Sequence, residues 1–273
     1  MEPLLHSEID FIPVLIGGSP RSGTTLLNSL ICTSQDVNEH MQECSYFGWN
    51  IQPLRLTLNT FKKSQRHYFS SEEQLISFHG ELLKQILIAN WKQEGCPKYL
   101  CLKNPNMVKD FVLLSPIFPM ARFVVIIRNP LDIIASRYEA EKRGNNDFAM
   151  GDHFVAGEID NINEIHSSVL NYFRTCPHDK MLVIEYEKLA TGHCLDRLNQ
   201  FLGLTDIGQN GPWSRTKENM HSKNSQWITS LHGQPIQDTS IGRHASVLPK
   251  EIIDQIASQT DASYSEVQQL AKD

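Results

Sequence analysis

Hydrophobic positions along the chain follow two patterns. Short, nearly continuous apolar runs rich in Val, Ile, Leu and aromatic residues, each followed by polar or turn residues, are typical of buried strands. These runs are residues 11–16, 99–102, 123–127 and 181–184. Segments with helical periodicity lie between and after them. These segments are residues 24–32, 72–91, 131–142, 195–202 and 249–272. Strands that alternate with helices predict an α/β fold in three layers, with a central parallel sheet flanked by helices.

Residues 144–164 follow neither pattern. They mix Gly, Asn and Asp with little apolar periodicity, which predicts a long loop or irregular insert over the sheet. Such loops often serve as lids or substrate-binding segments, although a plain surface excursion would have the same composition. A chain of 273 residues can form one large domain with a substantial core. We therefore expect a single domain over residues 1–273, in which residues 144–164 could act as a substrate-binding lid.

The overall charge and the cysteines exclude several classes of protein. With 25 basic and 31 acidic residues the formal charge is −6, whereas nucleic-acid binders are usually basic. The six cysteines form no CxxC pair and lack histidines at metal-ligand spacing, so we expect no metal site and a reducing compartment. Residues 1–18 carry acidic groups where a secretory signal needs basic ones, and no apolar run is long enough to cross a membrane. These features predict a cytoplasmic protein without a membrane span.

A glycine-rich loop follows the first predicted strand and leads into a helix. Its sequence is GGSPRSGTT, residues 17–25. The backbone N–H groups of such a loop, together with the positive end of the helix dipole, form a cradle for phosphate or sulfate. The Walker A pattern GxxxxGK[ST] fits from Gly18, except that Thr24 stands where a lysine would hold the β- and γ-phosphates of a triphosphate. The loop therefore predicts a ligand that brings one phosphate and no magnesium.

Two further basic residues follow predicted strands. Lys103 comes directly after the second strand, and Arg128 ends the third, where a magnesium-binding enzyme would have an acidic residue. Ligands of parallel α/β sheets bind beyond the carboxyl ends of the strands. We therefore expect the loop, Lys103 and Arg128 to surround one anionic ligand.

These motifs resemble those of sulfotransferases that use 3′-phosphoadenosine 5′-phosphosulfate (PAPS). The sequence PRSGTT after a strand is similar to the family's 5′-phosphosulfate loop. In IIRNPLDIIASRY, Arg128 and Ser136 have the spacing of the family's 3′-phosphate site. Lys103 is followed by Asn104 and Pro105, which resembles the family's Lys-x-Pro.

Two later stretches extend the resemblance. VIEYEKLATG resembles a family segment that places Tyr186 near the adenine or the 3′-phosphate, and SIGRHASVLPKE resembles the C-terminal segment that closes on the nucleotide. The resemblance runs from about residue 11 to about residue 251. It is closest to the tyrosylprotein-sulfotransferase-like branch and its bacterial relatives.

The resemblance implies a P-loop-NTPase-like fold and transfer of the sulfuryl group from PAPS to an acceptor hydroxyl, without a metal. The other product would be adenosine 3′,5′-bisphosphate. Arg21 and Lys103 would offset the charge on the transferring group. The implied donor-binding residues are Pro20, Arg21, Ser22, Gly23, Thr24, Thr25, Arg128, Ser136, Tyr186, Ser240, Gly242 and Arg243.

The resemblance also implies a catalytic base. Cytosolic small-molecule sulfotransferases carry a lysine in the first loop and a catalytic histidine two residues after the strand lysine. Arg21 and Pro105 occupy those positions here. The branch with a glutamate base fits better, because a glutamate follows the Asp36-Val37 pair. The family's distance from the Asp-Val pair to the glutamate leads to Glu43 if one residue is inserted here. Without the insertion the position falls on Gln42.

The sequence leaves several functional questions open. A magnesium-dependent small-molecule or nucleoside kinase is the alternative enzyme, and a non-catalytic nucleotide-binding protein is the second alternative. The acceptor could be a carbohydrate, a lipid, a peptide or a small natural product. No feature of the sequence indicates an oligomeric state.

Overall fold

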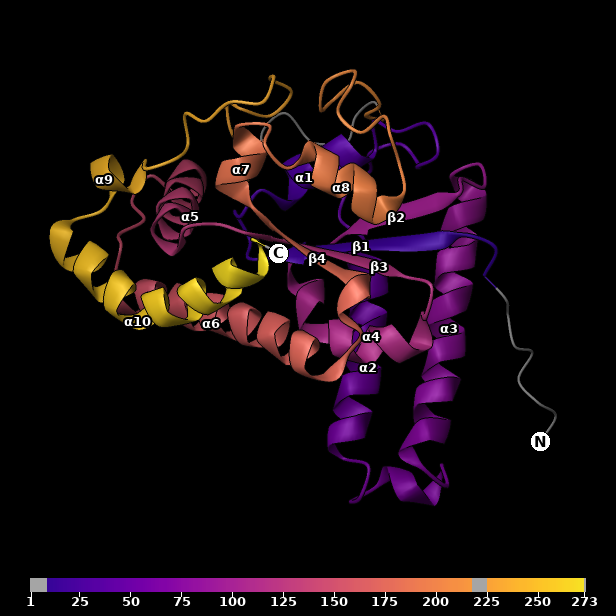
Figure 1. Cartoon of the computed structure of the whole chain (residues 1–273). Helices are drawn as coiled ribbons and strands as arrows, with labels where there is room; N and C mark the ends of the chain where they lie inside the picture. Colours follow the sequence, from indigo (N-terminus) through magenta and orange to yellow (C-terminus); the bar gives the residue numbers. More distant parts are fainter. Residues whose placement is uncertain (1–8, 218–224, 273) are drawn as a thin grey trace.

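A computed structural model describes residues 9–217 and 225–272 of the chain. Its centre is a sheet of four parallel strands in the order β2-β1-β3-β4 (Figure 1). The strands are β1 (Ile12–Gly18), β2 (Tyr99–Lys103), β3 (Arg122–Ile127) and β4 (Met181–Glu185). The predicted parallel sheet is confirmed, and each strand bound lies within two residues of its predicted position. Because β1 lies inside the sheet, the loop that follows it has a neighbouring strand end on either side.

Helices cover both faces of the sheet, which confirms the three predicted layers. One face packs against α1 (Thr24–Ile31), α7 (Tyr186–Ala190) and α8 (Leu195–Leu202). The other face packs against α2 (Ser45–Asn59), α3 (Glu72–Gln93), α4 (Phe111–Ile117) and α6 (Asp152–Thr175). Successive side chains of β1 point to opposite faces, so Val14 and Ile16 join the first core and Leu15 the second.

A third hydrophobic cluster holds the C-terminal part of the chain. It joins α5 (Pro130–Gly144), α6 and α10 (Lys250–Leu270). The short helix α9 (His244–Val247) precedes α10, and three 3₁₀ turns, η1 (Gln65–His67), η2 (Pro105–Asp110) and η3 (His178–Lys180), lie in connections. Helix α5 begins with Pro130, and the Asn129 side chain caps it by accepting a hydrogen bond from the Leu131 N–H.

The prediction of an irregular segment over residues 144–164 is wrong from residue 152 onward. Helix α6 begins at Asp152, and Val155, Ile159 and Ile162 are buried along one side of it. Their spacing of four and three residues is helical, but Gly157 and the polar residues of the outer side obscure the pattern. Only residues 145–151 lie between α5 and α6, so the proposed lid is a short connection followed by a packed helix.

Helices α2 and α3 form a hairpin that projects from the body of the molecule (Figure 1). Helix α2 was not predicted, because Pro53 lies inside it and its outer side is also apolar. Its buried residues Phe47, Ile51 and Leu54 join the core beneath the sheet. No helix within residues 9–217 and 225–272 is long and apolar enough to cross a membrane. Residues 1–8, part of the segment compared with a secretory signal, lie outside the described residues.

Candidate functional site

The carboxyl ends of the strands open into a cleft of about 710 Å³. Every predicted site residue lines this cleft except Ser22 and Gly242. The lining residues predicted from the sequence are Pro20, Arg21, Gly23, Thr24, Thr25, Glu43, Lys103, Arg128, Ser136, Tyr186, Ser240 and Arg243. The structure thus brings together residues that are more than 200 positions apart in the chain. Their individual roles stay predictions.

The loop between β1 and α1 is held in a tight conformation. Gly18 and Gly23 have φ values of 147° and 101°, in the region that favours glycine. A Cβ atom at Gly18 would lie 2.3 Å from the Ile126 carbonyl oxygen, and one at Gly23 would lie 2.5 Å from Cδ2 of Tyr186. The loop therefore fits only if both positions lack side chains.

The loop lines the cleft with residues 23–25, where α1 begins. No side chain caps this helix, so its first N–H groups are available to an anion. Within the predicted cradle, the Ser22 N–H already has a partner in the loop. The Ser22 N–H donates to the Ser19 carbonyl at 2.9 Å, because it closes the turn, and the Ser22 side chain is buried away from the cleft wall. Residues 23–25 are the better candidates.

Lys103 connects the loop to the predicted base. Its Nζ donates to Oε1 of Glu43 at 2.7 Å and to Oγ1 of Thr25 at 3.3 Å. The Cys44 N–H donates to the Lys103 carbonyl at 3.0 Å, which fixes the backbone beside Glu43 to the end of β2. Burial lowers the pKa of Lys103, and the Glu43 carboxylate opposes this shift. This end of the cleft therefore holds an ammonium, a carboxylate and a hydroxyl in direct contact.

Arginines gather around Arg21 in the same cleft, and the positive charge of Arg21 also lowers the pKa of Lys103. Arg21 donates from Nε to Oγ of Ser136 at 3.1 Å and from its terminal nitrogen to the Trp227 carbonyl at 2.8 Å. The pKa of Arg21 falls to about 10, first because it is buried and then because Arg143, Arg128 and other positive groups surround it. An acidic protein thus contains a locally positive cleft, as an anionic ligand requires.

Arg128 joins the loop between β1 and α1 to the C-terminal segment around Ser240. It donates to the Arg21 carbonyl at 3.0 Å and to the Ser240 carbonyl at 2.6 Å, and its guanidinium lies 4.3 Å from the Tyr186 ring centre. Its Nε atom is buried and has no hydrogen-bond partner among the described residues. A buried donor without an acceptor is costly, so the position fits a ligand that brings acceptor oxygens.

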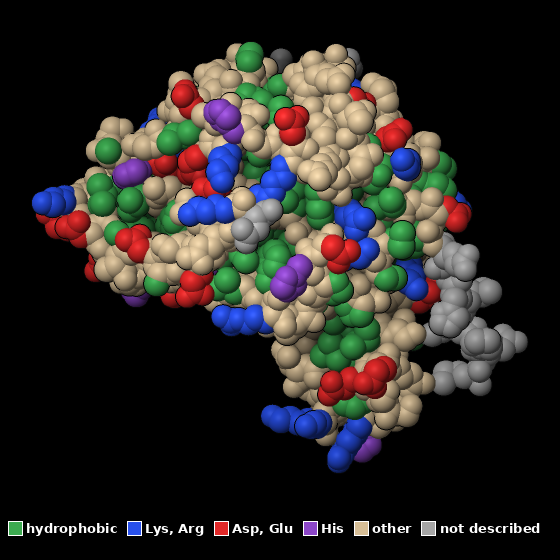
Figure 2. All heavy atoms as spheres, viewed as in Figure 1, with side chains coloured by type: hydrophobic (Ala, Val, Ile, Leu, Met, Phe, Trp, Pro, Cys, Tyr) green, Lys and Arg blue, Asp and Glu red, His purple; other side chains and the backbone are tan. Residues whose placement is uncertain are grey.

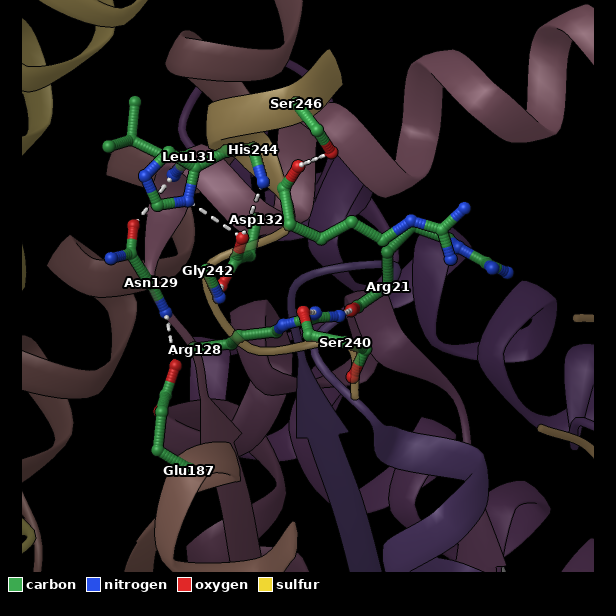
Figure 3. A network of polar contacts seen from close by, with 11 residues as sticks. Arg21, Arg128, Asn129, Leu131, Asp132, Glu187, Ser240, Gly242, His244 and Ser246 are labelled. Carbon is green, nitrogen blue, oxygen red and sulfur yellow. Dashed lines mark hydrogen bonds and ion pairs between the residues drawn. The ribbon is translucent and has the colours of Figure 1, made fainter. Parts of the chain in front are cut away.

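Residues 240–244, here called the latch segment, are tied to helix α5 (Figure 3). The buried carboxylate of Asp132 accepts hydrogen bonds from the N–H of Gly242 at 2.8 Å, the N–H of His244 at 3.0 Å and the His244 ring Nδ1 at 2.8 Å. The Tyr186 hydroxyl contacts Oγ of Ser240 at 2.6 Å. Gly242 has a positive φ of 73° and donates its N–H to Asp132, and its predicted contact with the nucleotide stays a prediction.

Arg243 extends from the latch segment and pairs with Glu139 of α5 at 2.6 Å. Asp132, His244 and Trp227 are site residues that the sequence analysis missed. Asp132 had a usable signal, because it lies four residues before Ser136 and therefore on the same side of α5. Trp227 had none, because it acts through its backbone carbonyl.

Within residues 9–217 and 225–272, no three His, Cys, Asp or Glu side chains group as metal ligands would. The predicted independence from metals is not tested by this finding. All six cysteines are unpaired.

Comparison with known proteins assigns the class. The model of the sulfotransferase family matches residues 13–206, which include β2, β3, β4 and all of β1 except Ile12, together with Glu43, Lys103, Arg128 and Ser136. The chain belongs to the sulfotransferase family.

Individual relatives agree with this assignment. Protein-tyrosine sulfotransferase 1 of Danio rerio is 27% identical over 133 residues, which are 46% of this chain and 35% of the relative. The chain thus spans about a third of the length of the curated relatives it matches. The sulfotransferase domain from the curacin biosynthetic pathway has the same fold, with a TM-score of 0.59, 14% identity and coverage of 93% of this chain and 99% of that domain. Mouse sulfotransferase SULT7A1, solved in complex with PAP, has a TM-score of 0.53 and 13% identity over 93% of this chain and 88% of that one.

Proposed function

We propose that this protein transfers the sulfuryl group of PAPS to an acceptor hydroxyl, with Glu43 as the general base and without a metal. One observation carries the proposal. Lys103 Nζ contacts both the Glu43 carboxylate and the Thr25 hydroxyl, next to the open N-terminus of α1. A base, a cation and an anion cradle therefore surround one point in the cleft. Transfer of an anionic group to a hydroxyl needs these three devices together.

The donor would lie along the cleft with its two phosphate ends apart. The N–H groups of residues 23–25 would hold the 5′-phosphate. Arg128, Ser136 and the latch segment would hold the 3′-phosphate, a use supported by the unpaired, buried Nε of Arg128. The mouse sulfotransferase of similar fold was solved in complex with PAP, which supports a nucleotide of this kind. A 3′-phosphate site is what would separate PAPS from ATP.

The proposed step moves one proton and one sulfuryl group. Glu43 takes the proton of the acceptor hydroxyl while the hydroxyl oxygen forms a bond to sulfur. The bond between that sulfur and the 5′-phosphate oxygen breaks, and adenosine 3′,5′-bisphosphate is the second product. Arg21 and Lys103 offset the negative charge that grows on the leaving oxygen, as cationic clamps do in phosphoryl transfer.

The acceptor is proposed only as a hydroxyl compound. The similar relatives include protein-tyrosine sulfotransferases, whose name points to a phenolic hydroxyl. Glu43 is 47% exposed at the mouth of the cleft, so an acceptor can approach it from solvent. Carbohydrate, lipid, peptide and small natural product acceptors all meet this requirement.

Thermal unfolding with added nucleotides tests the donor site. We expect adenosine 3′,5′-bisphosphate to raise the unfolding temperature, and magnesium chelation to leave this shift unchanged. Stabilisation by ATP with magnesium and none by the bisphosphate would instead support a kinase. Stabilisation by the bisphosphate without transfer to any acceptor class would support a non-catalytic nucleotide-binding protein.

A further inference from the structure

The outer side of helix α2 carries an apolar stripe that nothing in the described chain covers. Tyr46, Trp49 and Leu56 are 65%, 64% and 64% exposed. Given the 3.6 residues of a helical turn, Trp49 and Leu56 lie on the side of α2 roughly opposite to the buried Phe47 and Leu54, and Tyr46 lies at the edge of that side. A helix that is apolar on two opposite sides is typical of one covered on both.

The stripe belongs to a larger concentration of exposed apolar side chains. Among the described residues, nine large hydrophobic side chains are strongly exposed, and six of them lie in the α2–α3 hairpin. These six are Tyr46, Trp49, Leu56, Tyr68, Phe78 and Leu82. Scattered exposed hydrophobic residues need no explanation, but a gathered set marks an interaction surface.

Positive charge is concentrated in the same part of the chain. Residues 44–71 contain no Asp or Glu, although the protein as a whole carries a charge of −6. Their basic residues are Arg55, Lys62, Lys63, Arg66 and His67. Arg55 pairs with Asp110 of the body, whereas Lys62, Lys63 and Arg66 are exposed or nearly so at the free end of the hairpin. Figure 2 shows Lys and Arg side chains at the end of the projection, with a group of acidic side chains close to them on the same projection.

We propose that the α2–α3 hairpin docks on the surface of an anionic lipid bilayer. Trp, Tyr and Leu on one side of a helix, beside Lys and Arg, are the composition of helices that lie in the interface of a membrane. Anionic headgroups attract basic residues close to the surface. The projection of the hairpin from the body leaves its free end accessible to a flat surface (Figure 1).

The charge pattern favours a bilayer over a second copy of this chain. A symmetric dimer with its twofold axis at the free end of the hairpin would set Lys62, Lys63 and Arg66 against their own equivalents. At a bilayer surface with phosphatidylserine, the aromatic side chains can enter the interface while the basic side chains contact anionic headgroups.

Flotation with lipid vesicles tests the proposal on the full chain. We expect binding to vesicles that mix phosphatidylserine with phosphatidylcholine, and little binding to phosphatidylcholine alone. The triple variant Lys62→Gln, Lys63→Gln, Arg66→Gln should lower binding to the mixed vesicles about a hundredfold. Trp49→Ala should lower it about tenfold, because the indole no longer enters the interface.

Matched variants control for charge and apolar area elsewhere. Lys250→Gln removes an exposed charge from α10, and Met120→Ala removes an exposed apolar side chain outside the hairpin. Both should bind vesicles like the wild type. Nucleotide-induced thermal stabilisation reports that the hairpin variants are folded, independently of vesicle binding.

Three outcomes would overturn the proposal. The first is equal binding to both kinds of vesicle, or none to either. The second is unchanged binding by the triple and Trp49 variants. The third is a concentration-dependent dimer by light scattering that Trp49→Ala abolishes, which would make the stripe an interface between copies of this chain.

Discussion

Lys103 Nζ lies 2.7 Å from Oε1 of Glu43, and the two partners differ in their exposure to solvent. The lysine side chain is 4% exposed and the glutamate side chain is 47% exposed. The ammonium is therefore fixed at the end of β2, while the carboxylate reaches into the cleft from the segment before α2. This asymmetry suits a lysine that stays with the donor and a glutamate that meets the acceptor.

Replacing Glu43 with Gln should reduce turnover without weakening nucleotide binding. General bases contribute roughly 10²- to 10⁴-fold, so we expect kcat to fall within that range. The Kd for adenosine 3′,5′-bisphosphate should stay within about threefold, because in the proposed function Glu43 meets the acceptor and not the nucleotide. Glu39→Gln, an exposed glutamate four residues earlier, is the control. A Glu43→Gln enzyme with nearly full turnover would show that another group is the base.

Asp132 should act as a positioning residue for the 3′-phosphate. Its carboxylate holds the latch segment through three hydrogen bonds, so Asp132→Ala should release Ser240 and Arg243 from the cleft. We expect affinity for adenosine 3′,5′-bisphosphate to fall about tenfold or more, and affinity for AMP, which lacks the 3′-phosphate, to change little. Calorimetric titration of both nucleotides measures the ratio.

Two controls make the Asp132 experiment specific. Asp254→Ala removes an exposed carboxylate of α10 and should leave both affinities unchanged. Asp132→Glu keeps the charge and should recover part of the preference for the bisphosphate. An equal loss of affinity for AMP and the bisphosphate in Asp132→Ala would mean a general structural role.

Gly23→Ala should damage the phosphate loop more than a comparable glycine substitution elsewhere. Gly95 also has a positive φ, of 81°, but a Cβ there would have no atom within 4 Å. Both variants carry a backbone cost of about 1 kcal/mol, whereas only Gly23→Ala drives an atom into the buried Tyr186 ring. We expect a further loss of about 1–3 kcal/mol in unfolding free energy. Equal destabilisation of the two variants in urea would contradict the observed packing of the loop.

Acidification should destabilise the protein through His166. This side chain is buried between α6 and α10, and burial lowers its pKa from the ordinary 6.5 to about 4. The unfolded chain therefore takes up a proton before the folded one, and stability falls as the pH drops from about 6.5 to about 4. The loss due to this group amounts to about 3 kcal/mol when complete.

Comparison with His166→Gln isolates the contribution of His166. Asp110, Glu158 and Glu187 have pKa values raised chiefly by burial, so they change stability in the opposite direction over an overlapping range. The difference in unfolding free energy between wild type and variant, measured by urea denaturation across this range, should vary with pH. A constant difference would show that His166 does not titrate as described.

The sheet could be predicted from the sequence because its strands are buried on both faces. Such strands appear as uninterrupted apolar runs, as in residues 123–127. Helices were harder to predict where polar and apolar residues are mixed on both sides of the helix. Helix α2 was hidden by Pro53 and by the exposed Trp49, and the start of α6 by Gly157. In both cases packing against the core, not local propensity, stabilises the helix.

The donor loop and the Arg128–Ser136 spacing could be predicted because each lies within one local segment. The latch could not, because Asp132 and His244 are 112 residues apart in the chain. Hydrogen bonds between backbone groups could not be predicted either, such as the one from the Ser22 N–H to the Ser19 carbonyl. A sequence motif identifies the residue types that surround a ligand. Only the fold shows which of these residues are already hydrogen-bonded to one another.

Transfer of labelled sulfate from PAPS tests the central claim most directly. The protein is incubated with sulfur-labelled PAPS, a panel of hydroxyl acceptors and a magnesium chelator, beside the Glu43→Gln variant. We predict labelled product and stoichiometric adenosine 3′,5′-bisphosphate from the wild type, and about a hundredfold less from the variant. Bisphosphate release that is absent for every acceptor, in a protein that binds the nucleotide, would contradict the account.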